Sequence, residues 1–396
     1  VIAFVILACS SGVEPVETAA LAGPDLVVEV GENLRFDGEQ STGETAFWNF
    51  GDGTQADGFV VEHRYSVPGN FTAVLQVTGS DGAKKTDGVR VIAHRAEAEV
   101  LPVWSSTLAV DTQTGHVYMV NPEQDSLAVV SADGELVQLL DTCQGPRTVA
   151  VDEAADRVLV ACDKASAVDI FVASTLVHQG TVLFGVGERP FGVVARNGEW
   201  WVGLQGANAL VQFDGTQEQV RVDDIPDPRG LGLASDGTVY ATRWRSIDEV
   251  GWVSRVGKEG LSLALDTDPD SDTTSGGVPT LLDSLSFSPD GGSLFLPGHQ
   301  ANIRRGFYRN GQALNFETAV RAVLRVVQDG VESALLTKLF DERGHANVAI
   351  PSLLGNLVFV LHPGSQSISI LDAYSGASAG SILDVGHTPT GLALSP

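Results

Sequence analysis

One six-residue phrase, in which a proline precedes small and branched apolar residues, recurs in the second part of the chain and limits how that part can fold. Its four copies are residues 146–151, 190–195, 228–233 and 389–394. The first three copies are about 40 residues apart, which suits four short strands with their turns. The spacing therefore predicts a repeated array of four-stranded sheets, each opened by one copy of the phrase.

A second strand is expected after each opening. Six apolar runs provide it: residues 117–120, 158–160, 200–202, 239–241, 294–296 and 358–360. The last intervals are longer, which predicts inserts near residues 261–280 and 301–330.

Two of these regions resemble a known repeat family. Residues 117–121 with 126–130 resemble the YVTN repeat, and residues 367–372 resemble its third strand. The resemblance implies a β-propeller over residues 101–396 with six blades visible. Residues 106–110 already give the first blade an inner strand, so residues 391–396 are expected to open a seventh blade that the chain cuts short.

The composition agrees with an all-β chain and excludes some partners. The 396 residues include 44 Gly and 17 Pro but a single Met, which suggests many short strands and tight turns. The formal net charge of -26 repels nucleic-acid phosphate and anionic lipid headgroups. We therefore expect no nucleic-acid partner, and membrane contact only through an N-terminal lipid.

The segment before the repeats is organised differently. Residues 26–30 and 71–77 alternate with the period of two expected for sandwich strands. Between them, Trp48 and Phe50 occupy alternate positions before a Gly51-Asp52-Gly53 turn. With residues 22–25, 36–38 and 63–69, this pattern resembles the PKD domain over nearly all of residues 22–93. The resemblance implies an immunoglobulin-like β-sandwich over residues 24–95 in which Trp48 and Asp52 are structural.

The first twelve residues predict export. Residues 1–8 are an apolar run of signal-peptide length, too short to span a bilayer as a helix. Residues 6–9 resemble the bacterial lipobox, which implies lipid attachment at Cys9; an ordinary signal peptide is the alternative. Residues 13–23 then form a linker. The expected location is the bacterial cell envelope, as an outer-membrane lipoprotein, or the extracellular medium.

The remaining two cysteines are Cys143 and Cys162, which flank a predicted hairpin with strands at residues 148–152 and 157–161. Directly opposed pairing would place Arg147 across from Cys162, so a disulfide requires the loop before Arg147 to curl back. Both a disulfide and two free thiols stay open at this point.

Despite the acidic composition, several cationic or titratable residues fall in connections that a propeller gathers on one face. The candidates for binding a ligand there are Arg147, Arg189, Arg229, Arg243, Arg245 and His299. They could form a basic funnel around the central channel for an anionic ligand or for the carboxylates of a protein partner. The alternative is that each arginine pairs with a nearby Asp.

Candidates for chemistry are few. No zincin helix, P-loop, nucleophile elbow or Cys-x-x-Cys-His haem site occurs in the sequence. His299, His345 and His387 could converge at the propeller mouth, as a lactonase would require. The run of alternating carboxylates at Asp266, Asp268, Asp270 and Asp272 is a candidate calcium site, for which a solvated acidic loop is the alternative.

These observations favour a non-catalytic binding or scaffold protein, with the PKD domain as a spacer or adhesion module and calcium as the only cofactor considered. One alternative is the propeller half of an envelope redox protein fused to a c-type di-haem peroxidase domain, which the insert at residues 301–330 resembles. The second alternative is a lactonase-like enzyme.

Overall fold

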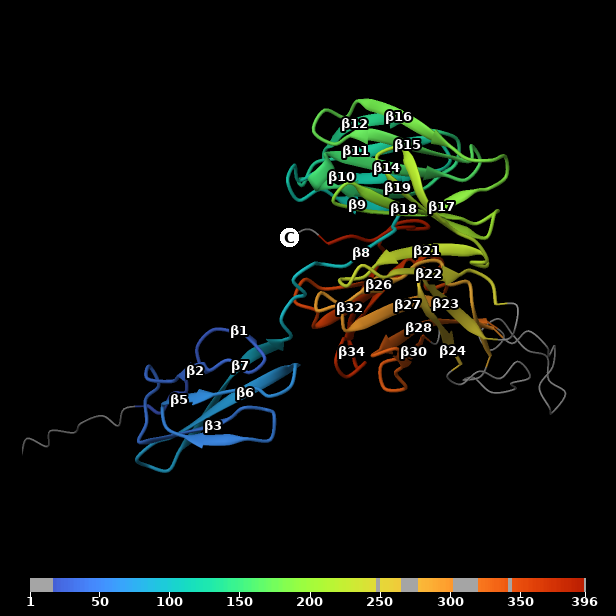
Figure 1. Ribbon diagram of the computed structural model, residues 1–396. Helices are drawn as coiled ribbons and strands as arrows, with labels where there is room; N and C mark the ends of the chain where they lie inside the picture. The colour runs from blue at the N-terminus through green and yellow to red at the C-terminus, as the bar shows by residue number, and fades with distance from the viewer. Residues whose placement is uncertain (1–16, 247–249, 265–276, 302–319, 341–343, 395–396) are drawn as a thin grey trace, which may run out of the picture. The chain divides into compact units, whose positions relative to one another are not determined.

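The computed structural model describes residues 17–246, 250–264, 277–301, 320–340 and 344–394. By their contacts the residues form two compact units, Val1–Arg95 and Ala96–Pro396. Apart from two single-turn 3₁₀ helices, η1 (Glu153–Ala155) and η2 (Pro363–Ser365), the regular structure in the described ranges is entirely strand (Figure 1). Within these ranges, no helix has the length and apolar character needed to cross a membrane.

The first unit is a β-sandwich. Its strands are β1 (Leu26–Glu29), β2 (Leu34–Asp37), β3 (Thr45–Asn49), β4 (Gln55–Asp57), β5 (Val60–His63), β6 (Gly69–Thr78) and β7 (Lys84–His94). One sheet has the order β1-β7-β6-β3-β4, and the other pairs β2 with β5. Strand β1 runs parallel to β7, whereas the other pairs are antiparallel.

The core of the sandwich explains why the predicted motif has its spacing. Trp48 and Phe50 are buried, and the ring of Phe36 lies 5.1 Å from that of Trp48 and 5.0 Å from that of Phe50. The buried Tyr65 hydroxyl donates a hydrogen bond to the Phe50 carbonyl at 2.9 Å. Gly51 follows with φ of +80°, and a Cβ there would lie 2.7 Å from the Thr72 carbonyl oxygen. Glycine therefore permits both the turn and the close approach of β6.

In its described residues the second unit forms six consecutive sheets, which we call blades 1 to 6. Blade 1 has β9 (Leu108–Val110), β10 (Val117–Asn121), β11 (Ser126–Val130) and β12 (Leu136–Asp141). Blade 2 has β13 (Pro146–Asp152), β14 (Arg157–Cys162), β15 (Ala167–Val172) and β16 (His178–Leu183). Blade 3 has β17 (Pro190–Arg196), β18 (Glu199–Leu204), β19 (Ala209–Asp214) and β20 (Gln217–Val222).

The other three blades follow the same order with additions. Blade 4 has β21 (Pro228–Leu233), β22 (Val239–Arg243), β23 (Gly251–Arg255) and β24 (Lys258–Leu263), and β8 (Val103–Trp104) pairs with β21. Blade 5 has β25 (Val278–Thr280), β26 (Ser286–Phe287), β27 (Ser293–Ala301), β28 (Val320–Gln328), β29 (Val331–Glu332) and β30 (Lys338–Phe340). Blade 6 has β31 (Val348–Pro351), β32 (Leu357–His362), β33 (Ser367–Asp372) and β34 (Ser378–Leu383).

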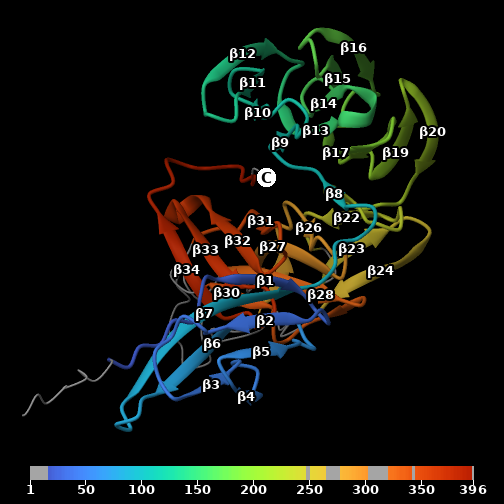
Figure 2. The same cartoon turned by 90° about the vertical axis from the view of Figure 1, so that its left-hand side faces the viewer.

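Each blade packs against the next in the chain, which is the architecture of a β-propeller. Buried side chains join blades 2 and 3 through Leu159 and Trp200, and blades 3 and 4 through Val194 and Leu231. Similar apolar clusters join blades 1 and 2, blades 4 and 5, and blades 5 and 6. The view in Figure 2 separates these sheets. The prediction of an all-β chain with an immunoglobulin-like sandwich and a propeller is therefore confirmed.

The proline-led phrase forms the first strand of blades 2, 3 and 4. Pro146, Pro190 and Pro228 each begin that strand, and a register shift follows each proline. Proline cannot donate to a ladder, so the start of a strand beside an irregularity is a position that accepts it. The six predicted second strands all lie in strands that are paired along both edges, namely β10, β14, β18, β22, β27 and β32.

The fourth copy of the phrase behaves differently. Residues 389–394 are in no strand. The Thr107 hydroxyl of the segment before β9 donates to the Thr390 carbonyl at 3.0 Å, and Leu392 and Leu394 pack on the apolar cluster of blade 6. This segment therefore lies between blade 6 and blade 1.

Candidate functional site

A row of side chains from equivalent positions of three blades forms the centre of the candidate site. Arg147, Phe191 and Arg229 each follow the proline that begins the first strand of blades 2, 3 and 4. The Arg229 guanidinium carbon lies 3.8 Å from the centroid of the Phe191 ring, and that of Arg147 lies 6.0 Å from it. The repeat of the sequence phrase thus places two cations near one aromatic ring.

Arg229 is the most constrained of the predicted arginines. Its guanidinium is also 4.2 Å from the Trp244 ring, and its Nε donates to Asp283 Oδ1 at 3.0 Å. Its side chain is 19% exposed, and burial lowers its pKa, partly against the attraction of Asp283. The charge of Arg147 lowers the pKa further, which shows that the two cations repel each other. Arg229 nevertheless stays protonated, as arginine does in proteins.

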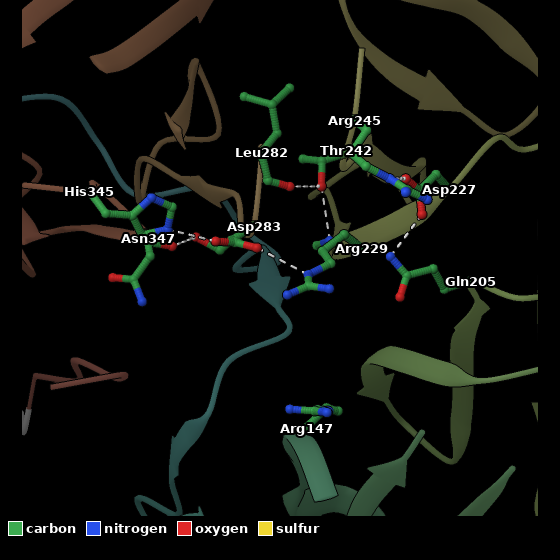
Figure 3. Close-up of polar contacts among 12 residues, drawn as sticks. Arg147, Gln205, Asp227, Arg229, Thr242, Arg245, Leu282, Asp283, His345 and Asn347 are labelled. Carbon is green, nitrogen blue, oxygen red and sulfur yellow. Dashed lines mark hydrogen bonds and ion pairs between the residues drawn. The ribbon is translucent and has the colours of Figure 1, made fainter. Parts of the chain in front are cut away.

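The terminal nitrogens of Arg229 are available to a ligand. Among the described residues no hydrogen bond involves its two Nη groups, and Figure 3 shows them pointing towards Arg147. The aromatic rings and Asp283 fix the plane of the guanidinium. A fixed planar fork facing a second guanidinium is an arrangement that favours a carboxylate or phosphate between them.

Arg147 and Arg189 share one aspartate. Asp163 is 5% exposed, and its Oδ2 lies 3.0 Å from Arg147 Nη2 and 3.6 Å from Arg189 Nη2. The Arg147 side chain is 33% exposed, whereas that of Arg189 is 50% exposed. Both arginines therefore have a carboxylate partner, but one carboxylate serves two cations.

Arg243 is the last residue of β22, and Arg245 follows just after the strand. Arg245 Nε lies 2.9 Å from Asp227 Oδ2, while Asp227 Oδ1 accepts a hydrogen bond from Gln205 at 2.8 Å. The Arg245 guanidinium carbon is 5.0 Å from the Trp244 ring. Arg243 is half-buried and lies opposite Pro228 in the ladder between β21 and β22.

His299 reaches the same network through a second histidine. His345 Nε2 is 2.9 Å from Asp283 Oδ2, and His345 Nδ1 contacts His299 Nε2. Burial lowers the pKa of His299 to about 4, with a further lowering by His345 and an opposing effect of Asp283. His299 is therefore neutral at physiological pH. Asp283 accordingly links Arg229 on one side with the histidine pair on the other.

The predicted group of ligand-binding residues is thus connected, and four of its arginines have an aspartate partner. Contacts run from Arg189 through Asp163 to Arg147, across Phe191 to Arg229, and on to Arg245 and His299. Arg147, Arg189, Arg229 and Arg245 each lie within 4 Å of an aspartate oxygen, which is the pairing that the sequence left open as the alternative to a basic funnel. The site is a mixed set of cations and carboxylates, as expected when guanidinium groups leave bulk water.

The convergence of three histidines is only partly found. His299 and His345 are in contact, whereas His387 instead bonds to Gln366 at 3.1 Å. Within the described ranges, the one group of three His, Cys, Asp or Glu side chains close enough to share an ion is Cys143, Cys162 and Asp169. The two cysteines of that group are joined by a disulfide, so they are not free as thiolate ligands.

The disulfide between Cys143 and Cys162 shows how the loop curls. Pro146, rather than Arg147, is the residue opposite Cys162, because a register shift follows Pro146. Gly145, with φ of +70°, turns the chain, and the Cys143 amide donates to Asp169 at 2.6 Å. The expectation that Arg147 faces Cys162 was wrong by this one-residue shift.

A cavity of about 750 Å³ lies where these side chains meet. Arg147, Phe191, Arg229 and Asp283 contribute to its lining, together with residues from the segment around Thr107 and from the first strand of blade 6. The volume is in the range of small-molecule and short-peptide sites. We call it the central cavity.

Several residues could not have been named from the sequence. Asp163, Asp227 and Asp283 pair with the predicted arginines, and Trp244 covers Arg229. Only Phe191 carried a signal, since it stands in the repeated phrase where Arg147 and Arg229 stand. Cys9 and the predicted calcium ligands Asp266, Asp268, Asp270 and Asp272 lie outside the described residues.

Comparisons with known proteins support the two-part architecture. Residues 14–93 match the PKD domain family model. No curated protein matches the chain. Hydrazine synthase from Kuenenia stuttgartiensis superposes with a TM-score of 0.55 at 11% identity, covering 70% of this chain and 78% of that one.

Two further structures show the same degree of likeness. A protein from Lactobacillus plantarum has a TM-score of 0.51 at 16% identity, covering 88% of this chain and 98% of that one. Virginiamycin B lyase from Staphylococcus aureus has a TM-score of 0.50 at 10% identity, with 72% and 89% covered. At such identities the likeness concerns the fold alone.

Proposed function

We propose that the propeller is a binding module that holds an anionic ligand in the central cavity, between Arg147 and Arg229. The observation that supports this proposal is the unused Nη edge of Arg229, fixed between Phe191 and Trp244 and facing a second guanidinium. An anion placed there relieves the repulsion that lowers the pKa of Arg229.

The surrounding carboxylates shape this role. Asp283 holds Arg229 through Nε and leaves its Nη groups to a ligand. Asp163 holds Arg147 through one Nη group. Each aspartate therefore orients a cation without occupying its whole donor edge, which is how a preorganised anion site is built.

The test uses blocked hexapeptides with a single ionisable side chain, one glutamate or one glutamine, and follows binding by peptide-detected NMR. The glutamate peptide should bind at least about tenfold more tightly than the glutamine peptide, since a charge-assisted bidentate contact contributes more than about 1.4 kcal/mol. The preference should weaken with salt.

The variant pair Arg147→Ala with Arg229→Ala should abolish that preference. Arg35→Ala in the sandwich is the matched control, because Arg35 is an exposed arginine paired with a single aspartate, Asp37. Equal binding of the two peptides by the parent protein contradicts the proposed function, as does a preference that survives the double change.

A catalytic role has a weaker basis. The line from Asp283 through His345 to His299 supports a lactonase-like alternative, because an imidazole oriented by a carboxylate can act as a base. His299 and His345 are not part of the lining of the central cavity, although Asp283 is. Hydrolysis of short acyl-lactones that is lost in His299→Gln would favour this alternative.

We also propose that the protein works in the bacterial cell envelope, anchored by a lipid on Cys9, with the sandwich as spacer or adhesion module. The support is the lipobox-like sequence and the PKD match. Labelled palmitate should enter the full-length protein and fail to enter a Cys9→Ser variant.

A further inference from the structure

A second cavity lies beside the central one, at the junction of blades 2 and 3. Its volume is about 720 Å³, and its lining includes Asp163, Lys164 and Arg189. Arg147 and Lys164 line both cavities. A ligand held in the central cavity can therefore continue into the second one without leaving the protein surface.

The charge balance of the second cavity is unlike that of the chain as a whole. Three cations, Arg147, Lys164 and Arg189, line it together with one carboxylate, Asp163. Lys164 makes no ion pair with any residue in the described part of the chain. The lining thus has a net charge of three minus one, or +2, in a chain whose formal charge is -26.

The carboxylate next to Arg189 in the sequence is already occupied. Glu188 precedes Arg189, but its Oε1 lies 2.7 Å from Arg221 and its Oε2 accepts the Gly185 amide at 2.8 Å. It therefore does not neutralise the second cavity.

Asp163 is not fully satisfied either. Both arginines contact its Oδ2, while its buried Oδ1 has no hydrogen-bond partner within the described ranges. An acceptor buried in this way is costly unless a donor reaches it. Asp163 is nine-tenths buried and lines the cavity, so its Oδ1 calls for a donor such as a peptide N–H, whereas the excess of positive charge calls for an anion.

The backbone holds this arrangement in place. Asp163 follows Cys162 of the disulfide, and its amide donates to the Gly145 carbonyl at 3.0 Å. Arg189 has φ of +51°, an uncommon value for a residue with a side chain, and its carbonyl accepts the Gln205 amide at 2.9 Å. Non-glycine residues held in this region concentrate at functional sites.

Building on the proposed function, we infer that the second cavity is a second anion subsite and that the ligand is an acidic peptide with two carboxylates. One carboxylate binds between Arg147 and Arg229, and the other binds at Arg189 and Lys164. The guanidinium of Arg189 is half-exposed and only loosely paired, at 3.6 Å, so it can take a ligand carboxylate while Asp163 retains Arg147. A peptide is the fitting class because two adjoining cavities of this size accept several residues.

The experiment compares the single-glutamate hexapeptide with blocked hexapeptides that carry two glutamates one to four residues apart. For the best spacing, the second glutamate should raise affinity about fivefold, the upper range for one partly exposed ion pair. A peptide with the same spacing, but with glutamate at one position and glutamine at the other, measures what the second charge adds to the affinity.

The variant Arg189→Ala should remove the gain from the second glutamate, while the single-glutamate peptide should keep its preference over the glutamine peptide. The double change Lys164→Ala with Arg189→Ala should also remove that gain, and it should weaken the single-glutamate peptide as well, because Lys164 lines the central cavity too. Arg35→Ala again serves as control, since its side chain is 59% exposed and paired with one carboxylate.

The outcomes separate the two proposals. If the single-glutamate peptide binds through Arg147 and Arg229 but no spacing of a second glutamate increases affinity, the second subsite is refuted while the binding function stands. A gain that persists in Arg189→Ala also refutes it. If no glutamate peptide is preferred over its glutamine counterpart, the binding function itself fails.

Discussion

Removing the disulfide between Cys143 and Cys162 should destabilise the propeller by an amount that the structure allows us to estimate. The bridge joins residues 19 apart in sequence and so closes a loop of about 20 residues. The chain-entropy relation for a loop of that length gives about 3 kcal/mol of stabilisation, through the restriction of the unfolded chain. The change to test is the double variant Cys143→Ala with Cys162→Ala.

The expected change in melting temperature follows from the size of the unit. The second unit spans residues 96–396. With an unfolding entropy of about 2.1 cal/mol/K per residue, a loss of about 3 kcal/mol lowers its melting temperature by about 5 °C. Alanine is chosen because Cys162 is fully buried among apolar side chains, where a hydroxyl would add a cost of its own.

Differential scanning calorimetry of the whole chain measures this effect. The described part of the first unit contains no cysteine, so its transition is an internal reference that should not move. Treating the parent protein with a dithiol should give the same shift as the double variant. A propeller transition that stays within about 1 °C of the parent in both cases would refute the reasoning, as would an equal shift of the sandwich.

Three further predictions concern single residues. Gly51→Ala should destabilise the sandwich by about 1 to 3 kcal/mol in urea unfolding, because the φ of Gly51 is +80° and a Cβ there would meet the Thr72 carbonyl. Gly53→Ala is the control: Gly53 has a φ of +92°, but a Cβ there would have no atom within 4 Å, so the loss of stability should be smaller. Burial alone would raise the pKa of Asp52, but the hydrogen bonds that its carboxylate accepts lower that pKa below 3.8. The stability that Asp52 contributes should therefore be present above pH 3.8 and be lost as the pH falls below it. In acid unfolding, Asp52→Asn should flatten this loss. His299 should titrate by NMR near pH 4. Because this pKa lies below that of an unfolded histidine, the stability of the propeller should fall as the pH is lowered from about 6.5 to 4. This fall should be absent in His299→Gln.

Much of the fold followed from local pattern. The alternation around Trp48 and Phe50 predicted which side chains enter the sandwich core, and both are buried. The spacing of the proline-led phrase predicted the first strands of blades 2 to 4, since proline restricts where a strand can begin. Blade 5 was less predictable, because β25 and β26 both pair with β27. Its long inserts interrupt the period on which the reasoning relied.

The candidate site was predictable in part. The repeated phrase placed Arg147 and Arg229 at equivalent positions, and the terminal nitrogens of Arg229 point towards Arg147 (Figure 3). The phrase contained no information on the aspartates, because Asp163 and Asp283 enter from other strands and loops. The sequence therefore predicted where the cations lie but left their pairing open.

The sequence alone determined which strands form and which arginines share a face. Strand period and repeat spacing are local properties of each blade's own sequence. The ionic partners were decided only by tertiary structure. A guanidinium leaving water pairs with whichever carboxylate comes within about 4 Å, and that distance depends on the packing of one blade against the next. Asp283 is 54 residues from Arg229 and yet 3.0 Å from its Nε, a proximity that no local pattern encodes.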